Sequence, residues 1–254
     1  MKLHRAIPYN LLLLITLVLL CSLIEIGCGR TNDVNRYLEN AGRYEQKSQY
    51  QKAIQAYQKA LEKNPHDAVT YYRLGYVYHS LSDFSKAEGA YLKAIDNDRS
   101  FIDAYVNLST LYHQDGWVRK GQRILEDALQ IDPRAYYVHL NLGQILYEVE
   151  EFDEAIEHYE TAIKLQQNSP LPYYNLGAVY LKKGDTEKAI ESLEKAIVQD
   201  PSFHDAYNLL AVIYDEEGDS EAAARYWKKR TIYGDKRDPM THMARKRYRM
   251  LVKR

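Results

Sequence analysis

The sequence has few cysteines and few aromatic residues other than tyrosine. Cys21 and Cys28 are its only cysteines in 254 residues, which excludes a disulfide-stapled fold and any cysteine-based zinc site beyond residue 28. It has 4 Phe and 2 Trp but 24 Tyr, so particular positions must select tyrosine. With 46% hydrophobic and 27% charged residues, the chain is neither disordered nor a polytopic membrane protein.

Catalytic signatures are also missing. The sequence contains no H-E-x-x-H, no G-x-S-x-G and no G-x-x-x-x-G-K-[ST] motif. His79 and His113 are spaced as if on neighbouring helices, but two imidazoles without further ligands fall short of a zinc site. We therefore expect no catalytic site, metal or cofactor, and interpret the protein as a non-enzyme.

The first residues have the pattern of an export signal. Lys2 and Arg5 precede an uncharged, leucine-rich run over residues 11–24. As a helix this run would span about 21 Å, which is shorter than a bilayer core of about 30 Å. The pattern predicts a signal peptide over residues 1–28 and a linker over residues 29–33.

Ile26-Gly27-Cys28 resembles the lipobox of bacterial lipoproteins, which implies lipidation of Cys28. Glu25 stands where that family normally has leucine, so two alternatives remain open. One is an uncleaved membrane anchor and the other is simple secretion. All three interpretations place the body of the protein outside the cytoplasm or tethered to a membrane, in the cell envelope.

Small residues recur every 34 positions in three ladders, which indicates a repeat protein. The ladders are Ala53, Ala87, Gly121, Ala155, Ala189 and Ala223; then Ala60, Ala94, Ala128, Ala162 and Ala196; and Ala41, Gly75, Ser109, Gly143, Gly177 and Ala211. Six units without insertion follow from them: 34–67, 68–101, 102–135, 136–169, 170–203 and 204–237. Each holds two apolar-periodic helices separated by a short polar turn.

The segments YYRLGYVY (71–78), YYNLGAVY (173–180), KAIQAYQKALEKNP (52–65) and KAIESLEKAIVQDP (188–201) resemble the tetratricopeptide repeat (TPR). The resemblance implies an all-α, right-handed α-solenoid of six helix-turn-helix units over residues 34–237. Such stacking buries apolar faces that one helix pair cannot bury alone. It also explains 13 tyrosines as packing residues: Tyr37, Tyr71, Tyr105, Tyr173, Tyr207, Tyr44, Tyr78, Tyr112, Tyr180, Tyr214, Tyr57, Tyr91 and Tyr159.

A basic capping helix is expected over residues 238–254, because Asp238-Pro239 is a helix start. Its apolar stripe would contain Met240, Met243, Ala244, Tyr248 and Leu251. Its other face would carry Arg245, Lys246, Arg247, Arg249, Lys253 and Arg254.

In TPR proteins the first helix of each unit lines a concave groove, which implies the partner-binding residues here. They are Tyr72, Arg73, Tyr76, His79, Asn107, His113, Tyr137, Asn141, Tyr147, Tyr174, Asn175 and Lys182. Tyrosine offers a rigid contact area with a polar tip, although the repeat itself also favours it. The three asparagines share one phase, and each carboxamide could pair with a peptide backbone unit.

The charges of the groove positions favour one kind of partner. Arg73 and Lys182 are outnumbered by acidic residues, which are Glu39, Glu45, Asp103, Glu148, Asp205, Asp215 and Glu216. A clamp for a terminal carboxylate is therefore not expected, and an internal segment of aromatic or basic character fits better.

Two functions follow from these features. The first is a scaffold of the cell envelope that binds an extended segment of another envelope protein, as an assembly factor. Its architecture resembles the lipid-anchored pilotin proteins, an analogy of fold alone. The alternative assigns binding of an anionic membrane or polymer surface to the C-terminal helix, because residues 228–254 carry 11 Lys and Arg against 2 Asp. The export signal argues against nucleic acid as a partner.

Overall fold

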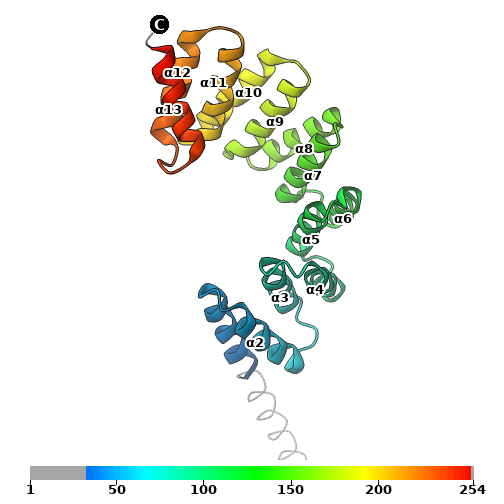
Figure 1. The fold of residues 1–254 in the computed structure, drawn as a ribbon. Helices are drawn as coiled ribbons and strands as arrows, with labels where there is room; N and C mark the ends of the chain where they lie inside the picture. The colour runs from blue at the N-terminus through cyan, green and yellow to red at the C-terminus, as the bar shows by residue number, and fades with distance from the viewer. Residues whose placement is uncertain (1–32, 253–254) are drawn as a thin grey trace, which may run out of the picture. The chain divides into compact units, whose positions relative to one another are not determined.

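A computed structural model describes residues 33–252. The signal segment, Cys28 and most of the linker, as well as Lys253 and Arg254, lie outside the described residues. Within these limits the chain forms two compact units that divide between Gly116 and Trp117. We call residues 33–116 unit 1 and residues 117–252 unit 2 (Figure 1).

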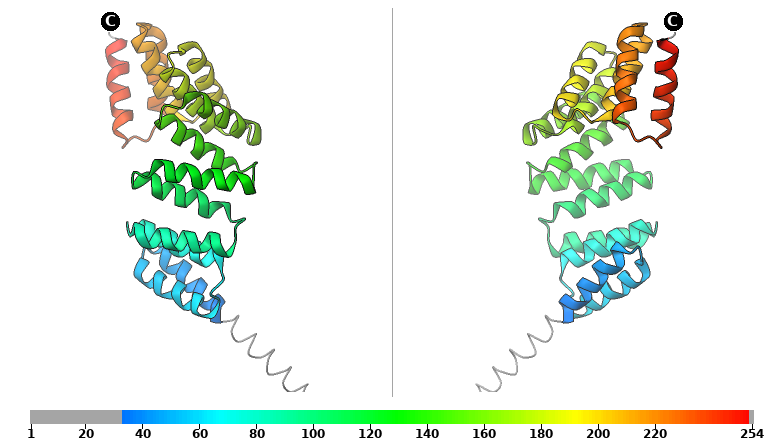
Figure 2. Two further views of the ribbon diagram at one scale, coloured as in Figure 1. Left: turned by 90° about the vertical axis from the view of Figure 1, so that its right-hand side faces the viewer. Right: turned by 90° about the vertical axis from the view of Figure 1, so that its left-hand side faces the viewer.

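Every regular element of the described residues is a helix. In unit 1 these are residues 33–46, α2 (Tyr50–Lys63), α3 (Ala68–Ser80), α4 (Phe84–Asn97) and α5 (Ile102–Gln114). In unit 2 they are α6 (Val118–Ile131), α7 (Tyr136–Glu148), α8 (Phe152–Leu165), α9 (Pro170–Lys182), α10 (Thr186–Gln199), α11 (His204–Glu216), α12 (Ser220–Tyr233) and α13 (Pro239–Leu251). Within each unit, consecutive helices pack side by side as hairpins (Figure 2). The predicted all-α TPR class is confirmed.

The helices keep the period of the sequence. The first helices α3, α5, α7, α9 and α11 begin 34 residues apart, as do the second helices α2, α4, α6, α8, α10 and α12. The turn between them has a positive φ at the same phase: Gly116, Gly184 and Gly218 at +80° to +81°, and Ser48, Ser82 and Glu150 at 55° to 63°. The left-handed conformation ends the first helix whether or not the residue is glycine.

The third small-residue ladder makes room for large side chains of the second helices. A Cβ on Gly75 would lie 2.7 Å from the ring of Tyr91, and one on Gly143 would lie 2.6 Å from that of Tyr159. Tyr57, Tyr91 and Tyr159 are all at most 1% exposed. The close approach of the paired helices therefore depends on the absence of a side chain at the ladder positions.

The repeat of residues 136–169 departs from this packing through a pair of histidines. Tyr207 donates a hydrogen bond from its hydroxyl to the carbonyl oxygen of Pro201 at 3.0 Å. The equivalent His139 places Nε2 3.1 Å from the carbonyl oxygen of Pro133. Since a carbonyl only accepts, Nε2 of His139 must donate, and its Nδ1 accepts from Nδ1 of His158 at 2.9 Å. Burial and the neighbouring His139 lower the pKa of His158 to about 4.

Helix α13 packs against α12, but its apolar stripe differs from the expected one. Ala244 and Leu251 are buried and Tyr248 packs against the same core. Met240 and Met243 are 40% and 44% exposed, so their assignment to the buried stripe is wrong. They lie on another side of the helix, because a buried polar residue, Thr241, takes part of the contact with α12.

Two ion pairs attach α13 to the preceding helices. Arg230 is 2% exposed and binds Asp238 and Thr241, the latter at 2.8 Å. Arg247 donates two hydrogen bonds to the carboxylate of Asp215, at 2.8 and 2.9 Å. Both arginines belong to the basic segment of residues 228–254, so part of its positive charge is neutralised by ion pairs within the fold.

Helix α13 also continues the repeat register as if it were another first helix. Arg245 lies 34 residues after Ala211 and 68 residues after Gly177, in the third small-residue ladder. At Gly177 a Cβ would already lie 2.8 Å from Leu193 of the second helix. An arginine therefore occupies the position at which the preceding repeats have a small residue.

Candidate partner-binding surface

The residues expected to face a partner on α3 fall into two groups. Tyr76 and Arg73 are exposed. Tyr72 is partly buried, with its ring 4.9 Å from that of Phe101 in an edge-on contact. Burial and the negative charge of Asp103 raise the pKa of Tyr72. Tyr76 and Arg73 are thus presented to solvent, while Tyr72 also contributes to packing between helices.

Two side-chain hydrogen bonds join α3 to α5 along this surface. Asn107 donates from Nδ2 to the hydroxyl oxygen of Tyr72 at 2.8 Å. His79 Nε2 lies 2.6 Å from Oε1 of Gln114, and it donates because an amide oxygen accepts. The amide group of Asn107 is therefore engaged within unit 1, which leaves its carbonyl oxygen for a partner.

His113 is partly buried on α5. Over residues 33–252, no group of three or more His, Cys, Asp and Glu side chains is arranged to hold a metal ion.

In unit 2 the expected residues lie on α7 and α9. Tyr137 is 63% exposed. Asn141 donates a hydrogen bond from Nδ2 to the backbone oxygen of Tyr137 at 2.7 Å. Tyr147 and Asn175 are partly buried, and Lys182 is exposed.

Tyr174 packs edge-on against Phe203 with 5.6 Å between ring centroids, and its burial raises its pKa. The three asparagines share a phase, but Asn107 and Asn141 bond different partners.

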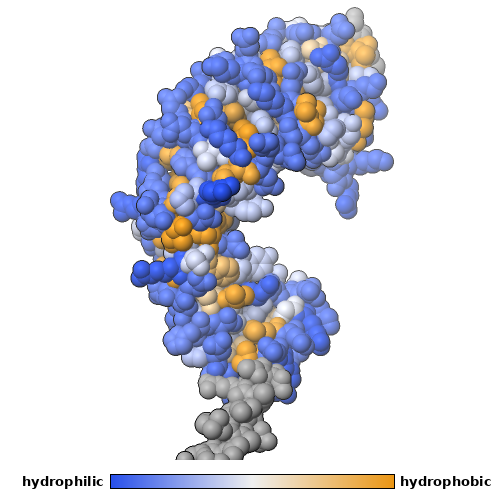
Figure 3. Space-filling model, turned by 180° about the vertical axis from the view of Figure 1, so that it is seen from behind, coloured by the Kyte–Doolittle hydropathy of each residue, from blue (hydrophilic) through white to orange (hydrophobic). Residues whose placement is uncertain are grey.

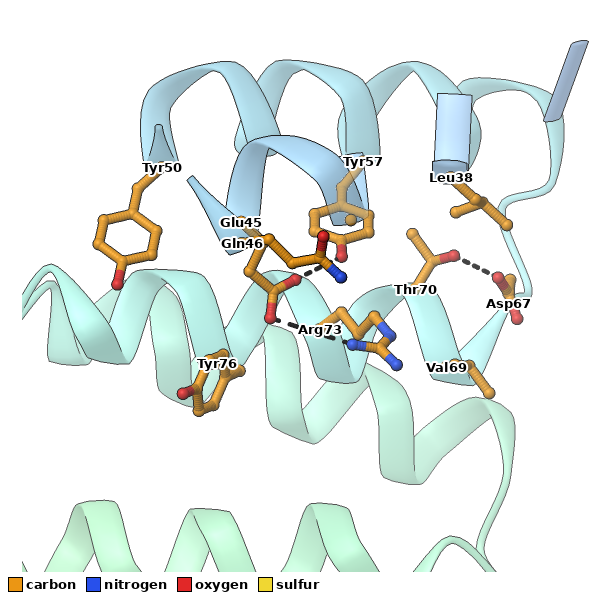
Figure 4. Close-up of a pocket in the computed structure, with 11 residues that line it drawn as sticks. Leu38, Glu45, Gln46, Tyr50, Tyr57, Asp67, Val69, Thr70, Arg73 and Tyr76 are labelled. Carbon is orange, nitrogen blue, oxygen red and sulfur yellow. Dashed lines mark hydrogen bonds and ion pairs between the residues drawn. The ribbon is translucent and has the colours of Figure 1, made fainter. Parts of the chain in front are cut away.

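A pocket of about 430 Å³ lies in unit 1, where residues 33–46, α2 and α3 meet (Figure 4). Arg73 and Tyr76 line it from α3. Gln46 and Tyr50, which the repeat phase did not indicate, line it from the two sides of the first turn. Sequence reasoning missed them because it considered only certain phases of the first helices, whereas the last residue of the first helix and the first residue of α2 also line the pocket. We call this cavity the unit 1 pocket.

The carboxylate of Glu45 lies at the centre of the unit 1 pocket. It accepts a hydrogen bond from the hydroxyl of Tyr57 at 2.7 Å, and Arg73 NH1 lies 3.9 Å from its other oxygen. Burial and this bond to Glu45 raise the pKa of Tyr57. Tyr57 is thus both a core residue and the floor of the pocket.

On the face drawn in Figure 3, small groups of hydrophobic side chains are set among hydrophilic ones. No helix in the described part of the chain is long and apolar enough to cross a membrane.

Comparison with protein families agrees with the helical repeat. A TPR repeat family matches residues 43–82 and 143–184. Other tetratricopeptide repeat families match residues 68–101 and 102–134, 170–203 and 192–225. The chain is therefore a tetratricopeptide repeat protein. No curated protein matches its sequence.

Solved structures give the same fold. PilW, a widely conserved type IV pilus biogenesis factor, is 18% identical with a TM-score of 0.70, covering 83% of this chain and 97% of its own. PilF of Pseudomonas aeruginosa is 19% identical with a TM-score of 0.68, covering 86% and 99%. YrrB, a TPR protein with an unusual peptide-binding site, is 23% identical with a TM-score of 0.56, covering 76% and 100%. The fold is that of a protein–protein interaction scaffold.

Proposed function

We propose that the protein is a non-catalytic scaffold of the cell envelope that binds an extended segment of another envelope protein along its first helices. The observation that carries the proposal is the contrast between two sets of tyrosines. Tyr76 and Tyr137 of first helices are 47% and 63% exposed, whereas Tyr91 and Tyr159 of second helices are buried. Exposed tyrosines on rigid helices provide contact area at low entropic cost.

Two further observations support a location in the cell envelope and an extended protein segment as the partner. The export pattern of residues 1–28 precedes the repeats, and Ile26-Gly27-Cys28 resembles the lipobox of bacterial lipoproteins. Among proteins of the same fold, PilW is a type IV pilus biogenesis factor and YrrB has an unusual peptide-binding site. A role in the assembly of an envelope structure is consistent with these features.

Capture from native membranes by crosslinking tests the proposal. The double variant Tyr76→Ala/Tyr137→Ala removes exposed contact area and leaves the packed tyrosines in place. The control Leu92→Ala/Val198→Ala removes exposed apolar groups from second helices, where the side chains are 39% and 75% exposed. Helical circular dichroism and unchanged melting must first show that both variants fold.

An envelope protein captured by the wild type and the control, but lost from the tyrosine variant, is the expected result. Equal capture by all three chains would refute binding along the first helices.

The second candidate function is binding of an anionic membrane surface through α13. The observation that favours it is an exposed face on which Met243 and Met250, 44% and 49% exposed, adjoin Lys246 and Arg249. Basic residues near an anionic surface contribute about 1 kcal/mol each at low salt. Cosedimentation with phosphatidylglycerol vesicles, lost at high salt and in Lys246→Gln/Arg249→Gln, would support this function. Binding unaffected by salt or by these changes would contradict it.

A further inference from the structure

The unit 1 pocket contains a carboxylate with unused hydrogen-bonding capacity. A carboxylate has about four acceptor sites, and within the described residues Glu45 accepts one hydrogen bond, from Tyr57. Arg73 forms an ion pair with the other oxygen across 3.9 Å, a distance too long for a hydrogen bond. The side chain of Glu45 is only 18% exposed, so the pocket shields it from water. A cation placed beside it would therefore interact more strongly than at an open surface.

Two aromatic rings line the pocket beside this carboxylate. Tyr50 from α2 and Tyr76 from α3 lie on the same side of the pocket, with the carboxylate of Glu45 pointing between the two helices (Figure 4). A ring face attracts an ammonium or guanidinium group within about 6 Å. Carboxylate and rings together form a site suited to a cation.

The chain already pairs tyrosine faces with lysines elsewhere. Lysine ammonium groups of second helices lie over tyrosines of first helices: Lys52 over Tyr44, Lys59 over Tyr37, Lys86 over Tyr78, Lys93 over Tyr71 and Lys188 over Tyr180, at 5.3 to 5.9 Å. Within residues 33–252, neither Tyr50 nor Tyr76 has such a cation. Both rings line the unit 1 pocket, and Tyr76 is 47% exposed.

The other residues that line the pocket suit a ligand with a positively charged group next to an apolar one. Asp67 adds a second carboxylate, held by the hydroxyl of Thr70, so that the pocket contains two acidic residues and the single cation Arg73. At the other end Leu38 and Val69 provide an apolar wall (Figure 4).

We propose that the unit 1 pocket receives the side chain of a lysine or arginine of the bound segment. Its cationic group lies between Glu45 and the rings of Tyr50 and Tyr76, and a neighbouring apolar side chain of the segment contacts Leu38 and Val69. The assignment rests on the proposed function and names the chemistry of its partner: a segment with a basic residue next to an apolar one.

Labelled peptides that differ in one residue test this assignment. The probes are fluorescein-Ser-Ala-Leu-X-Ala-Ser-amide, with X as Lys, Arg, norleucine or Glu, and fluorescence anisotropy measures their binding to the full chain. We expect the Lys and Arg peptides to bind about five- to tenfold more tightly than the norleucine peptide, as for one shielded ion pair with a cation–π contact.

Two variants locate the effect. Glu45→Gln keeps an oxygen for the Tyr57 hydroxyl but removes the charge, and should reduce the preference for Lys to about twofold or less. Glu62→Gln is the matched control, an exposed glutamate of α2 outside the pocket, and should leave the preference intact. If Glu45→Gln fails to fold by circular dichroism, Tyr76→Leu takes its place, because it removes a ring and preserves apolar volume.

Three results would overturn the assignment: equal affinity for Lys and norleucine, a preference for Glu that would place an anion on Arg73, or no saturable binding of any peptide. These outcomes are separable from the proposed function. Capture of an envelope protein that depends on Tyr76 and Tyr137 but not on Glu45 would leave the scaffold function standing without the cationic pocket.

Discussion

Acidification from pH 7 to pH 5 should loosen the α7–α8 helix pair, because the site of His158 disfavours its protonated, positively charged form. Nε2 of His139 donates to the carbonyl of Pro133, and its Nδ1 accepts from His158. Burial and the neighbouring His139 disfavour a positive charge on His158, which is why its pKa is lowered. Forcing that charge into the partly buried site between α7 and α8 costs folding free energy.

The magnitude follows from the difference between folded and unfolded pKa values. His158 has a pKa of about 4 in the folded chain, and about 6.5 in an unfolded one. Its contribution to stability is therefore fully present above about pH 6.5 and is lost as the pH falls toward about 4. Between pH 7 and pH 5 the free energy of unfolding of this pair should fall by about 1–2 kcal/mol, the lower figure allowing for partial solvent contact.

Hydrogen exchange measured by mass spectrometry resolves this effect by helix. After correction for the intrinsic exchange rate, amides of α7 and α8 should lose about five- to thirtyfold of their protection at pH 5, and those of α10 much less. The control is His139→Tyr/His158→Ala, which copies the residues at the same phases two units earlier, Tyr71 and Ala90. The same loss of protection in wild type and control would refute the reasoning.

Three further predictions concern the turns, the helix contacts and α13, each measured by urea unfolding or hydrogen exchange. At the positive-φ turns, Glu150→Gly should stabilise the chain by about 0.5–1 kcal/mol and Gly184→Ala should destabilise it by about 1 kcal/mol; opposite signs would contradict the turn argument. Gly143→Ala should cost about 2 kcal/mol, since its Cβ would lie 2.6 Å from a buried ring, whereas Gly89→Ala, with open space around it, should gain up to about 1 kcal/mol. Asp215→Asn weakens the bidentate ion pair to α13 and should lower the protection of that helix by about 1 kcal/mol; unchanged exchange would show that the ion pair does not hold it.

The helices were predictable because each repeat places the same kinds of residue at the same positions, 34 residues apart. Gly75 and Gly143 recur at the phase where Tyr91 and Tyr159 need space, so a ladder of small residues already implies two close helices. Residue type alone would not indicate the positive φ of Ser82, because its φ of 59° is imposed by the repeat and not by its own preference.

The unit 1 pocket was only partly predictable for a related reason. Arg73 and Tyr76 follow from the phase of one helix. Gln46 ends the helix of residues 33–46 and Tyr50 begins α2, and their approach to α3 depends on how three helices meet, which no single period encodes. The exposed position of Met240 was missed because an apolar residue in a helix indicates a face but not which neighbour covers it.

Arg245 has a consequence for how molecules of this protein meet one another. A stack of repeats has ends that resemble its own interior, and such ends can join head to tail into an open fibre. In the α9–α10 pair, Leu193 of α10 packs at the corresponding position directly on Gly177 of α9, where there is no side chain. A helix of a second molecule that packed on α13 as α10 packs on α9 would meet the side chain of Arg245 there instead. We therefore expect this position to disfavour head-to-tail stacking of one molecule on another.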